Sequence, residues 1–268
     1  MARKLNDELV RKLAPQGEYA NILKEVIKDK ELSLEIREGK AIIYYQKGKI
    51  LTLSKDKIEY LSSGYYKNKE KNFKFSDEQT KQTPKEYFKI AKSLVYEYGN
   101  KKEFTIQQLI AAENSSINNE YLVIDMEYQY KQSDIAKDER LPFTRIDLLA
   151  IEKESKDIIL FELKQGIKAL NGKSGVEEHI KKTRSLIEDS KFKKALLKDV
   201  ETIIMQKSKL QILPGADKWI DEIKMKATIK PMFIFVYFED SEKEEYDKIL
   251  DNRIPTIYFH PNYILTKK

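Results

Sequence analysis

The segment that most constrains the fold of this chain is Ile158–Gly166, IILFELKQG, where an acid and a base stand two residues apart in an apolar run. Apolar runs of this length are typical of a strand buried on both faces. Because strand side chains alternate between faces, Glu162 and Lys164 share one face, and Phe161 and Leu163 share the other. Burying a charge without a partner costs several kcal/mol, so these two side chains need a partner or a task.

The preceding segment, RIDLLAIEK, brings a second carboxylate to the same face. If the turn KESKD is centred at Glu154–Ser155, the antiparallel hairpin places Asp147 opposite Glu162 and Arg145 opposite Lys164. A loop with an odd number of residues would shift this pairing by one position. Carboxylates that face each other across a strand pair repel, and neutralising either one should relieve that repulsion. Two acids beside a lysine therefore make physical sense if a divalent cation lies between them.

The residue types at this position indicate which cation. The chain has no Cys and no His next to the motif, and hard oxygen ligands select Mg²⁺ or Mn²⁺ over Zn²⁺. Such an ion polarises a phosphoryl oxygen and lowers the pKa of a bound water. Lys164 could orient that water or stabilise the developing charge. These parts suit the hydrolysis of a phosphodiester.

The pattern of the remaining chain predicts a mixed α/β fold, α+β overall. Residues 1–30 read as helices with a break at Pro15–Gly17, and residues 31–61 read as an antiparallel meander of three or four strands. The polar stretch 63–83 is the predicted boundary between a small N-terminal α+β module, 1–82, and a larger domain, 83–268. From Thr105 the predicted order is helix, three strands, a basic helix from about Val176, strand, helix and strand, which indicates a mixed sheet flanked by helices.

At this point the chain resembles the PD-(D/E)XK nuclease superfamily, which has the restriction-endonuclease-like fold. The resemblance rests on Asp147, fourteen intervening residues, then Glu162-Leu163-Lys164, and on the αβββαβ order between Thr105 and His260. It implies a Mg²⁺-dependent nuclease acting on nucleic acid, DNA more than RNA. Asp147, Glu162 and the Leu163 carbonyl would be metal ligands, and Lys164 would be the catalytic lysine. Ile146 stands where the family pattern has a proline.

Two further acids are candidates for the same site. Glu113 falls in line with Ile106, Leu109 and Ile110 on a predicted helix, so it should lie on the stripe that faces the sheet, where the superfamily often carries an acid. The alternative is a solvent-exposed last turn.

Glu127 is predicted to share a strand face with Val123, Asp125 and Gln129. It would complete the metal site, or a second one, if its strand neighbours the Asp147 strand. The alternative is an exposed sheet edge.

The positive charge of the chain favours a polyanionic partner. The formal net charge is +6, and residues 181–209 carry nine Lys or Arg against four Asp or Glu. A second basic cluster spans Lys67–Lys74. A solvated surface is the alternative for each cluster. The predicted nucleic-acid contacts are Arg145, Gln165, Lys168, Lys173, His179, Lys181, Lys182 and Arg184.

Other features bound the setting. No apolar run approaches the roughly 18 residues of a membrane span, and the N-terminus lacks the apolar core of a signal peptide, so a cytoplasmic location without membrane partners is expected. The N-terminal module could aid substrate binding or the formation of a homodimer. The alternative function is a catalytically silent nuclease fold that binds nucleic acid or serves as an interaction module.

Overall fold

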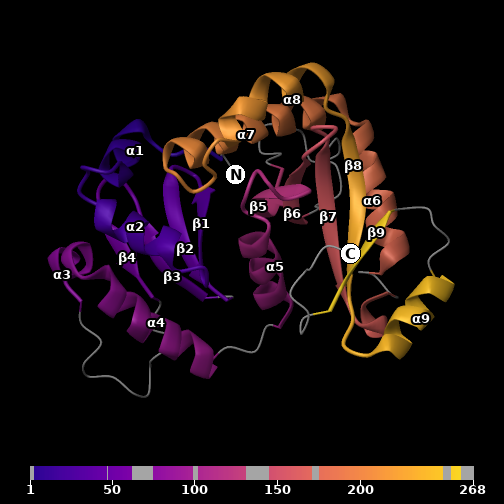
Figure 1. Cartoon of the computed structure of the whole chain (residues 1–268), viewed down its shortest axis with the longest axis horizontal. Coiled ribbons are helices and arrows are strands. Elements are labelled where there is room, and N and C mark those ends of the chain that lie inside the picture. The colour runs from indigo at the N-terminus through magenta and orange to yellow at the C-terminus, as the bar shows by residue number, and fades with distance from the viewer. Residues whose placement is uncertain are drawn as a thin grey trace, which may run out of the picture. The chain divides into compact units, whose positions relative to one another are not determined.

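The computed structural model describes residues 3–46, 48–61, 75–98, 102–130, 145–170, 175–249 and 255–260. The fold is mixed α/β, with an antiparallel four-stranded sheet and a mixed five-stranded sheet (Figure 1). The chain divides into two compact units, the N-terminal unit (1–112 with 202–217) and the C-terminal unit (113–201 with 218–268). This division lies between Ala112 and Glu113, whereas the sequence predicted a boundary near residue 82.

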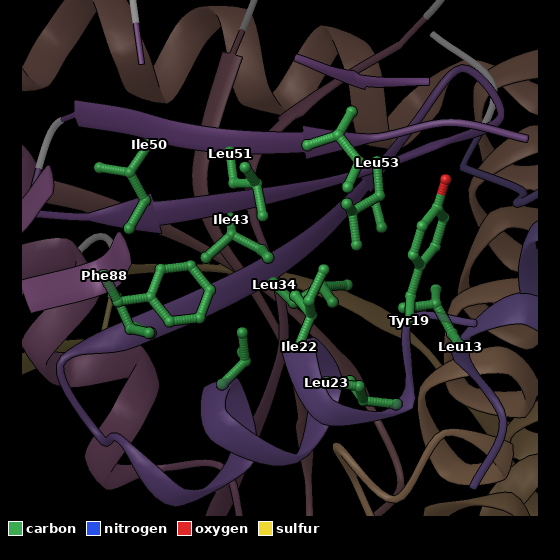
Figure 2. Close-up of a cluster of buried hydrophobic side chains, with 14 of the residues drawn as sticks. Leu13, Tyr19, Ile22, Leu23, Leu34, Ile43, Ile50, Leu51, Leu53 and Phe88 are labelled. Carbon is green, nitrogen blue, oxygen red and sulfur yellow. The ribbon is translucent and has the colours of Figure 1, made fainter. Parts of the chain in front are cut away.

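The N-terminal unit is a meander covered by helices. Its four strands are β1 (Leu32–Arg37), β2 (Lys40–Tyr45), β3 (Gly48–Leu53) and β4 (Ile58–Tyr60), paired in that order and antiparallel throughout, as predicted. The helices are α1 (Asp7–Leu13), α2 (Ala20–Lys28), α3 (Asp77–Gln82), α4 (Pro84–Tyr98) and α5 (Lys102–Glu113). Leu34, Ile43 and Leu51 from the sheet pack with Ile22 of α2 and Phe88 of α4 in one buried core (Figure 2).

Helix α5 differs from its predicted role. Gln108 is buried, and its Nε2 donates hydrogen bonds to the main-chain oxygens of Glu31 (2.7 Å) and Tyr44 (3.1 Å). The ring of Phe104 contacts that of Tyr44, and Leu109 is 42% exposed. Ile106 and Ile110 of the predicted stripe are buried, but Leu109 and Glu113 are exposed. The stripe is therefore confirmed only in part, because Gln108, paired with two main-chain carbonyls, takes a buried position beside it. This helix packs on the meander of the N-terminal unit.

The C-terminal unit contains the five-stranded sheet. Its strands are β5 (Tyr121–Gln129), β6 (Arg145–Glu152), β7 (Ile158–Gln165), β8 (Ile229–Val236) and β9 (Thr256–Phe259), in that order. β5, β6 and β7 are antiparallel, whereas β7, β8 and β9 are parallel. Parallel neighbours need crossovers. These contain α6 (Val176–Glu188), α7 (Ser190–Lys209), α8 (Ile220–Lys226) and α9 (Asp240–Ile249), with the short 3-10 helices η3 (Ile167–Leu170) and η4 (Ala216–Trp219). The basic helix that was predicted from Val176 is split into α6 and α7 at Asp189.

The sheet forks between β6 and β7. Their pairing runs from Ile151↔Ile158 to Leu148↔Phe161 and ends there. Beyond that point β6 continues beside β5 to Arg145, and β7 continues beside β8 to Gln165. The observed pairs confirm the predicted turn centre, and one further step in the same register places Asp147 across from Glu162. The candidate acids therefore stand at the fork.

Asp157 fastens the β6–β7 turn to the start of β8. Its Oδ1 accepts hydrogen bonds from the main-chain N–H (2.7 Å) and the hydroxyl (2.8 Å) of Thr228, and its Oδ2 pairs with Lys230. Burial alone would raise the pKa of this carboxyl, but the donors from Lys230 and Thr228 outweigh burial and lower the pKa to about 2. The hairpin that carries Asp147 and Glu162 is thus held by a buried carboxylate.

We predict that Asp157→Asn lowers the free energy of unfolding by about 2 kcal/mol at pH 7. The folded-state pKa, about 2, lies below the ordinary value of 3.8, so the contribution is complete above pH 4 and is lost as the pH falls toward 2. Urea unfolding of wild type and variant should show the difference shrinking to about half at pH 3. A difference that is the same at pH 7 and pH 3 would contradict this assignment.

Candidate active site

Glu162 and Lys164 lie on a sheet face that α6 covers. In the β7–β8 pairing Glu162 stands beside Phe233, and Lys164 stands beside Phe235. Both phenylalanines pack in one buried cluster with Ile180 of α6. Only 12% of the Glu162 side chain and 5% of the Lys164 side chain are exposed. Lys164 is therefore buried and Glu162 largely buried, beside two apolar side chains of β8.

Two nitrogen-bearing side chains lie close to one oxygen of Glu162. Lys164 Nζ lies 3.1 Å from Glu162 Oε1, and His179 Nδ1 of α6 lies 2.7 Å from the same atom. The distance to His179 is that of a close polar contact, although Nδ1 forms no hydrogen bond with the described residues. Among the residues that the structure describes, no hydrogen bond or ion pair reaches the other oxygen, Oε2. The sequence predicts His179 as a phosphate contact, and in the structure its ring lies against Glu162.

Asp147 is buried at the fork, on the strand opposite Glu162. Its Oδ2 accepts a hydrogen bond from the main-chain N–H of Leu163 at 2.7 Å. A side-chain oxygen thus serves as the acceptor for β7 just where the β6–β7 pairing has ended. Each of the two acids has a donor within the chain, so their repulsion does not by itself require a cation.

Glu127 lies on β5, the strand next to the one that carries Asp147. The sequence requires this neighbourhood if Glu127 is to complete the metal site. The pairs Met126↔Leu148 and Tyr128↔Ile146 bracket the positions of Glu127 and Asp147. The Oε2 atom of Glu127 forms an ion pair with Arg145 Nε at 2.7 Å. Arg145, which was predicted to lie opposite Lys164, is instead paired with Glu127 on the neighbouring strand.

A bulge in β5 corrects part of the predicted face. Val123 pairs with Ala150, but Asp125 pairs with Leu149. Adjacent residues of β6 point to opposite faces, so Val123 and Asp125 do not share a face as predicted.

The other residues predicted for the site do not contact Asp147, Glu162 or Lys164 through any described interaction, or they lie outside the described residues. Glu113 is exposed as the last residue of α5, and no contact among the described residues joins it to Asp147 or Glu162. Gln165 is half-buried at the end of β7, and Lys168 is exposed in η3. Lys173 and the cluster Lys67–Lys74 lie outside the described residues.

The basic residues of α6 share their helix with acids. Lys181 and Arg184 are exposed and Lys182 is half-buried. The other exposed charged residues of α6 are Glu177, Glu178 and Glu188. The outer surface of α6 is consequently mixed in charge.

Helix α7 packs on the opposite face of the sheet. The Tyr128 hydroxyl donates a hydrogen bond to Asp199 Oδ2 of α7 at 2.9 Å. Tyr128 also pairs in the sheet with Ile146, which precedes Asp147 in β6. Neighbouring strand residues point to opposite faces, so α7 and Asp147 lie on different sides. The exposed lysines of the first half of α7 are Lys191, Lys193, Lys194 and Lys198.

Lys207 does not belong to a basic surface. It is buried, and its Nζ pairs with Glu35 Oε2 at 2.9 Å within the N-terminal unit. Of the nine basic residues counted between 181 and 209, this one serves the core of the N-terminal unit.

The comparisons with known proteins add no relative. No family model, curated protein or solved structure matches this chain. Within the described residues, no group of three or more His, Asp and Glu side chains is placed to hold a metal ion, and no helix is long and apolar enough to cross a membrane. The two carboxylates and the lysine at the fork remain the strongest candidate site.

We predict that Glu162→Gln destabilises the metal-free protein by about 1–3 kcal/mol, because the variant removes the carboxylate from the ion pair with the buried Lys164. If repulsion between the Asp147 and Glu162 carboxylates dominated, the same variant would be more stable than wild type. Urea unfolding in EDTA decides between the two. The double variant Glu162→Gln, Lys164→Met is the matched control and should recover part of the loss. A single variant that is more stable than wild type would show that repulsion dominates.

Proposed function

We propose that this chain is a metal-dependent nuclease that hydrolyses phosphodiester bonds, with DNA as the expected substrate. The observation that carries the proposal is the position of Asp147, Glu162 and Lys164 on one face, at the point where β6 and β7 separate. A buried lysine next to an acid at a sheet fork has little value as a stability device, because a buried ion pair can often be replaced by apolar side chains at no loss.

The order of elements supports a restriction-endonuclease-like core. α5, β5, β6, β7, α6 and β8 occur in this order along the chain, with α7 and α8 inserted between α6 and β8. The first three strands are antiparallel, and β8 is parallel to β7. The packing of α5 on the N-terminal meander is a departure from the expected arrangement. The proposal therefore depends on the hairpin and α6 more than on α5.

The residues at the fork fit a hard divalent cation. The Asp147 and Glu162 carboxylates and the Leu163 carbonyl would hold Mg²⁺ or Mn²⁺, because all three are oxygen donors without a competing thiolate. Oε2 of Glu162, which carries no contact from the described residues, is a ready donor. When bound, such an ion polarises a phosphoryl oxygen and makes a water molecule more acidic.

Lys164 has the chemistry to act on the attacking water. Its ammonium group is a compact, positively charged hydrogen-bond donor that lies 3.1 Å from Glu162 Oε1. Phe233 and Phe235 flank the two side chains on β8 and exclude bulk water from that side. An ammonium group in such surroundings acts more strongly on a developing negative charge than it would in water.

A second candidate function follows from the internal pairing of the acids. Asp147 is hydrogen-bonded to the Leu163 N–H, and Glu162 contacts both Lys164 and His179. A nuclease fold without catalysis, serving as a nucleic-acid-binding or interaction module, would be stable with such contacts and no metal. Metal-dependent cleavage separates the two functions.

We predict that the wild-type protein cleaves nucleic acid in Mg²⁺ or Mn²⁺ and that Asp147→Asn and Glu162→Gln each lower the rate at least 100-fold, since each removes a ligand charge. The assay compares duplex DNA, single-stranded DNA and RNA, with EDTA as the blank. Glu154→Gln, which changes an exposed acid in the β6–β7 turn, is the control and should cleave normally. Near-full activity in either site variant, or no cleavage by wild type, would reject the nuclease proposal.

We also predict that α6 contacts substrate phosphates, because it covers the face that carries Glu162. Two triple variants to Gln are compared by salt titration of duplex binding in Ca²⁺. The α6 variant replaces Lys181, Lys182 and Arg184. The α7 control replaces Lys191, Lys194 and Lys198, which are exposed on a helix of the opposite face.

Each lost phosphate contact flattens the slope of log affinity against log salt by about 0.9 for duplex DNA. Two residues of the α6 set are exposed, so this variant should lose about 2 units of slope. The α7 control should change it little. A larger effect from the α7 set would move the binding surface to the other face, and no effect from α6 would make its charges a solvated surface.

A further inference from the structure

The contact between α6 and Glu162 gives His179 a role that neither the motif nor the nuclease proposal assigns. His179 lies in the first turn of α6, and its Nδ1 is 2.7 Å from Glu162 Oε1. Both side chains are largely buried, with 19% and 12% of their surfaces exposed. They also line one small pocket between α6 and the strands β7 and β8, together with Thr183 and Met232.

We infer that His179 is a positioning residue, which holds Oε1 of Glu162 so that the other carboxylate oxygen is left for a metal ion. The inference rests on the proposed function, since it presumes that Glu162 is a metal ligand. A glutamate side chain that points into a sheet face can adopt several rotamers, and each additional contact removes some of that freedom. Lys164 comes from the same strand, whereas His179 comes from a separate element and fixes the carboxylate relative to α6.

The opposite role, competition between His179 and the metal ion, is disfavoured by the position of the contacts. Lys164 and His179 both meet Oε1, and the described residues place no contact on Oε2. A competitor would occupy the oxygen that the ion needs. A partner that holds Oε1 leaves Oε2 oriented for the metal ion. Groups that orient a metal ligand in this way raise the affinity of the site for the metal.

The test is Mn²⁺ binding to the metal-free full-length protein, measured by calorimetry and by the loss of the free-Mn²⁺ resonance signal. His179→Ala should weaken binding 10- to 100-fold, which is the usual effect of losing a group that orients a ligand. His179→Asn keeps an amide N–H near the position of Nδ1 and should restore most of the affinity. His179→Gln places its amide near the position of Nε2 instead and should restore less.

Two controls isolate the effect from folding and from chemistry. Glu178→Ala changes the exposed neighbour of His179 on the same helix turn and should bind Mn²⁺ as wild type does. Circular dichroism of each variant identifies any loss of fold. In the cleavage assay, His179→Ala should raise the Mn²⁺ concentration for half-maximal rate by the factor found in binding, while the rate at saturating Mn²⁺ changes less.

The outcomes separate the two proposals. If folded His179→Ala binds Mn²⁺ as tightly as wild type, or more tightly, the positioning role is overturned and the nuclease proposal stands. A second possible result is that wild type binds no Mn²⁺, or that the Asp147→Asn variant binds Mn²⁺ as tightly as wild type does. Either result would reject the metal site, and the role of His179 would be rejected with it. Loss in the Ala variant and recovery in the Asn variant would support the inference.

Discussion

The buried contact between Lys164 and Glu162 is the interaction on which the candidate site depends. Charges with 5% and 12% exposure need partners from more than one direction, because removing one partner from a buried pair leaves an uncompensated charge. Glu162 also meets His179 of α6, a residue from outside the strand. The packing of α6 over Phe233 and the electrostatics of Glu162 are therefore two aspects of one arrangement.

The fork in the sheet explains why this arrangement occurs at one place only along the β6–β7 hairpin. From Ile151 to Leu148 the β6 residues pair with β7, and the side chains there are buried and apolar. From Leu148 toward Arg145, β6 stays paired with β5 and β7 stays paired with β8, but β6 and β7 are no longer paired with each other. The main-chain N–H of Leu163 therefore needs another acceptor. Asp147 provides it. At the other end of the hairpin, Asp157 fastens the turn to β8, so both ends are fixed by buried carboxylates.

Much of the fold was predictable from local patterns. Runs rich in β-branched and aromatic residues predicted β5 to β9, and the turn residues around Ser155 gave the register that the observed β6–β7 pairs confirm. The meander was equally clear from alternation and turn signals. The placement of α5 was not predictable, because Gln108 is buried through hydrogen bonds to two carbonyls that are distant in sequence. Amphipathic spacing cannot anticipate such a partner.

The site was predictable in its residues and less so in its contacts. The spacing of Asp147, Glu162 and Lys164 showed that they share a face, but the fork, the Leu163 hydrogen bond and the bulge after Val123 depend on where strand pairing stops. His179 carried one signal, its position at the start of the helix after the motif, and that signal did not show which group it would meet. The count of basic residues overestimates the basic surface at Lys207, because this side chain is buried and paired with Glu35.

The most direct test of the metal-site account is a crystal structure of the protein soaked in Mn²⁺, with anomalous diffraction data collected at the manganese absorption edge. If the fork binds a metal ion, one strong anomalous peak is expected there, within ligand distance of the Asp147 and Glu162 carboxylates, with His179 still against Glu162. The same crystals of Asp147→Asn should lack the peak. A wild-type map without a peak at the fork, although Mn²⁺ is seen elsewhere in the crystal, would contradict the account and leave the buried ion pair as a structural feature.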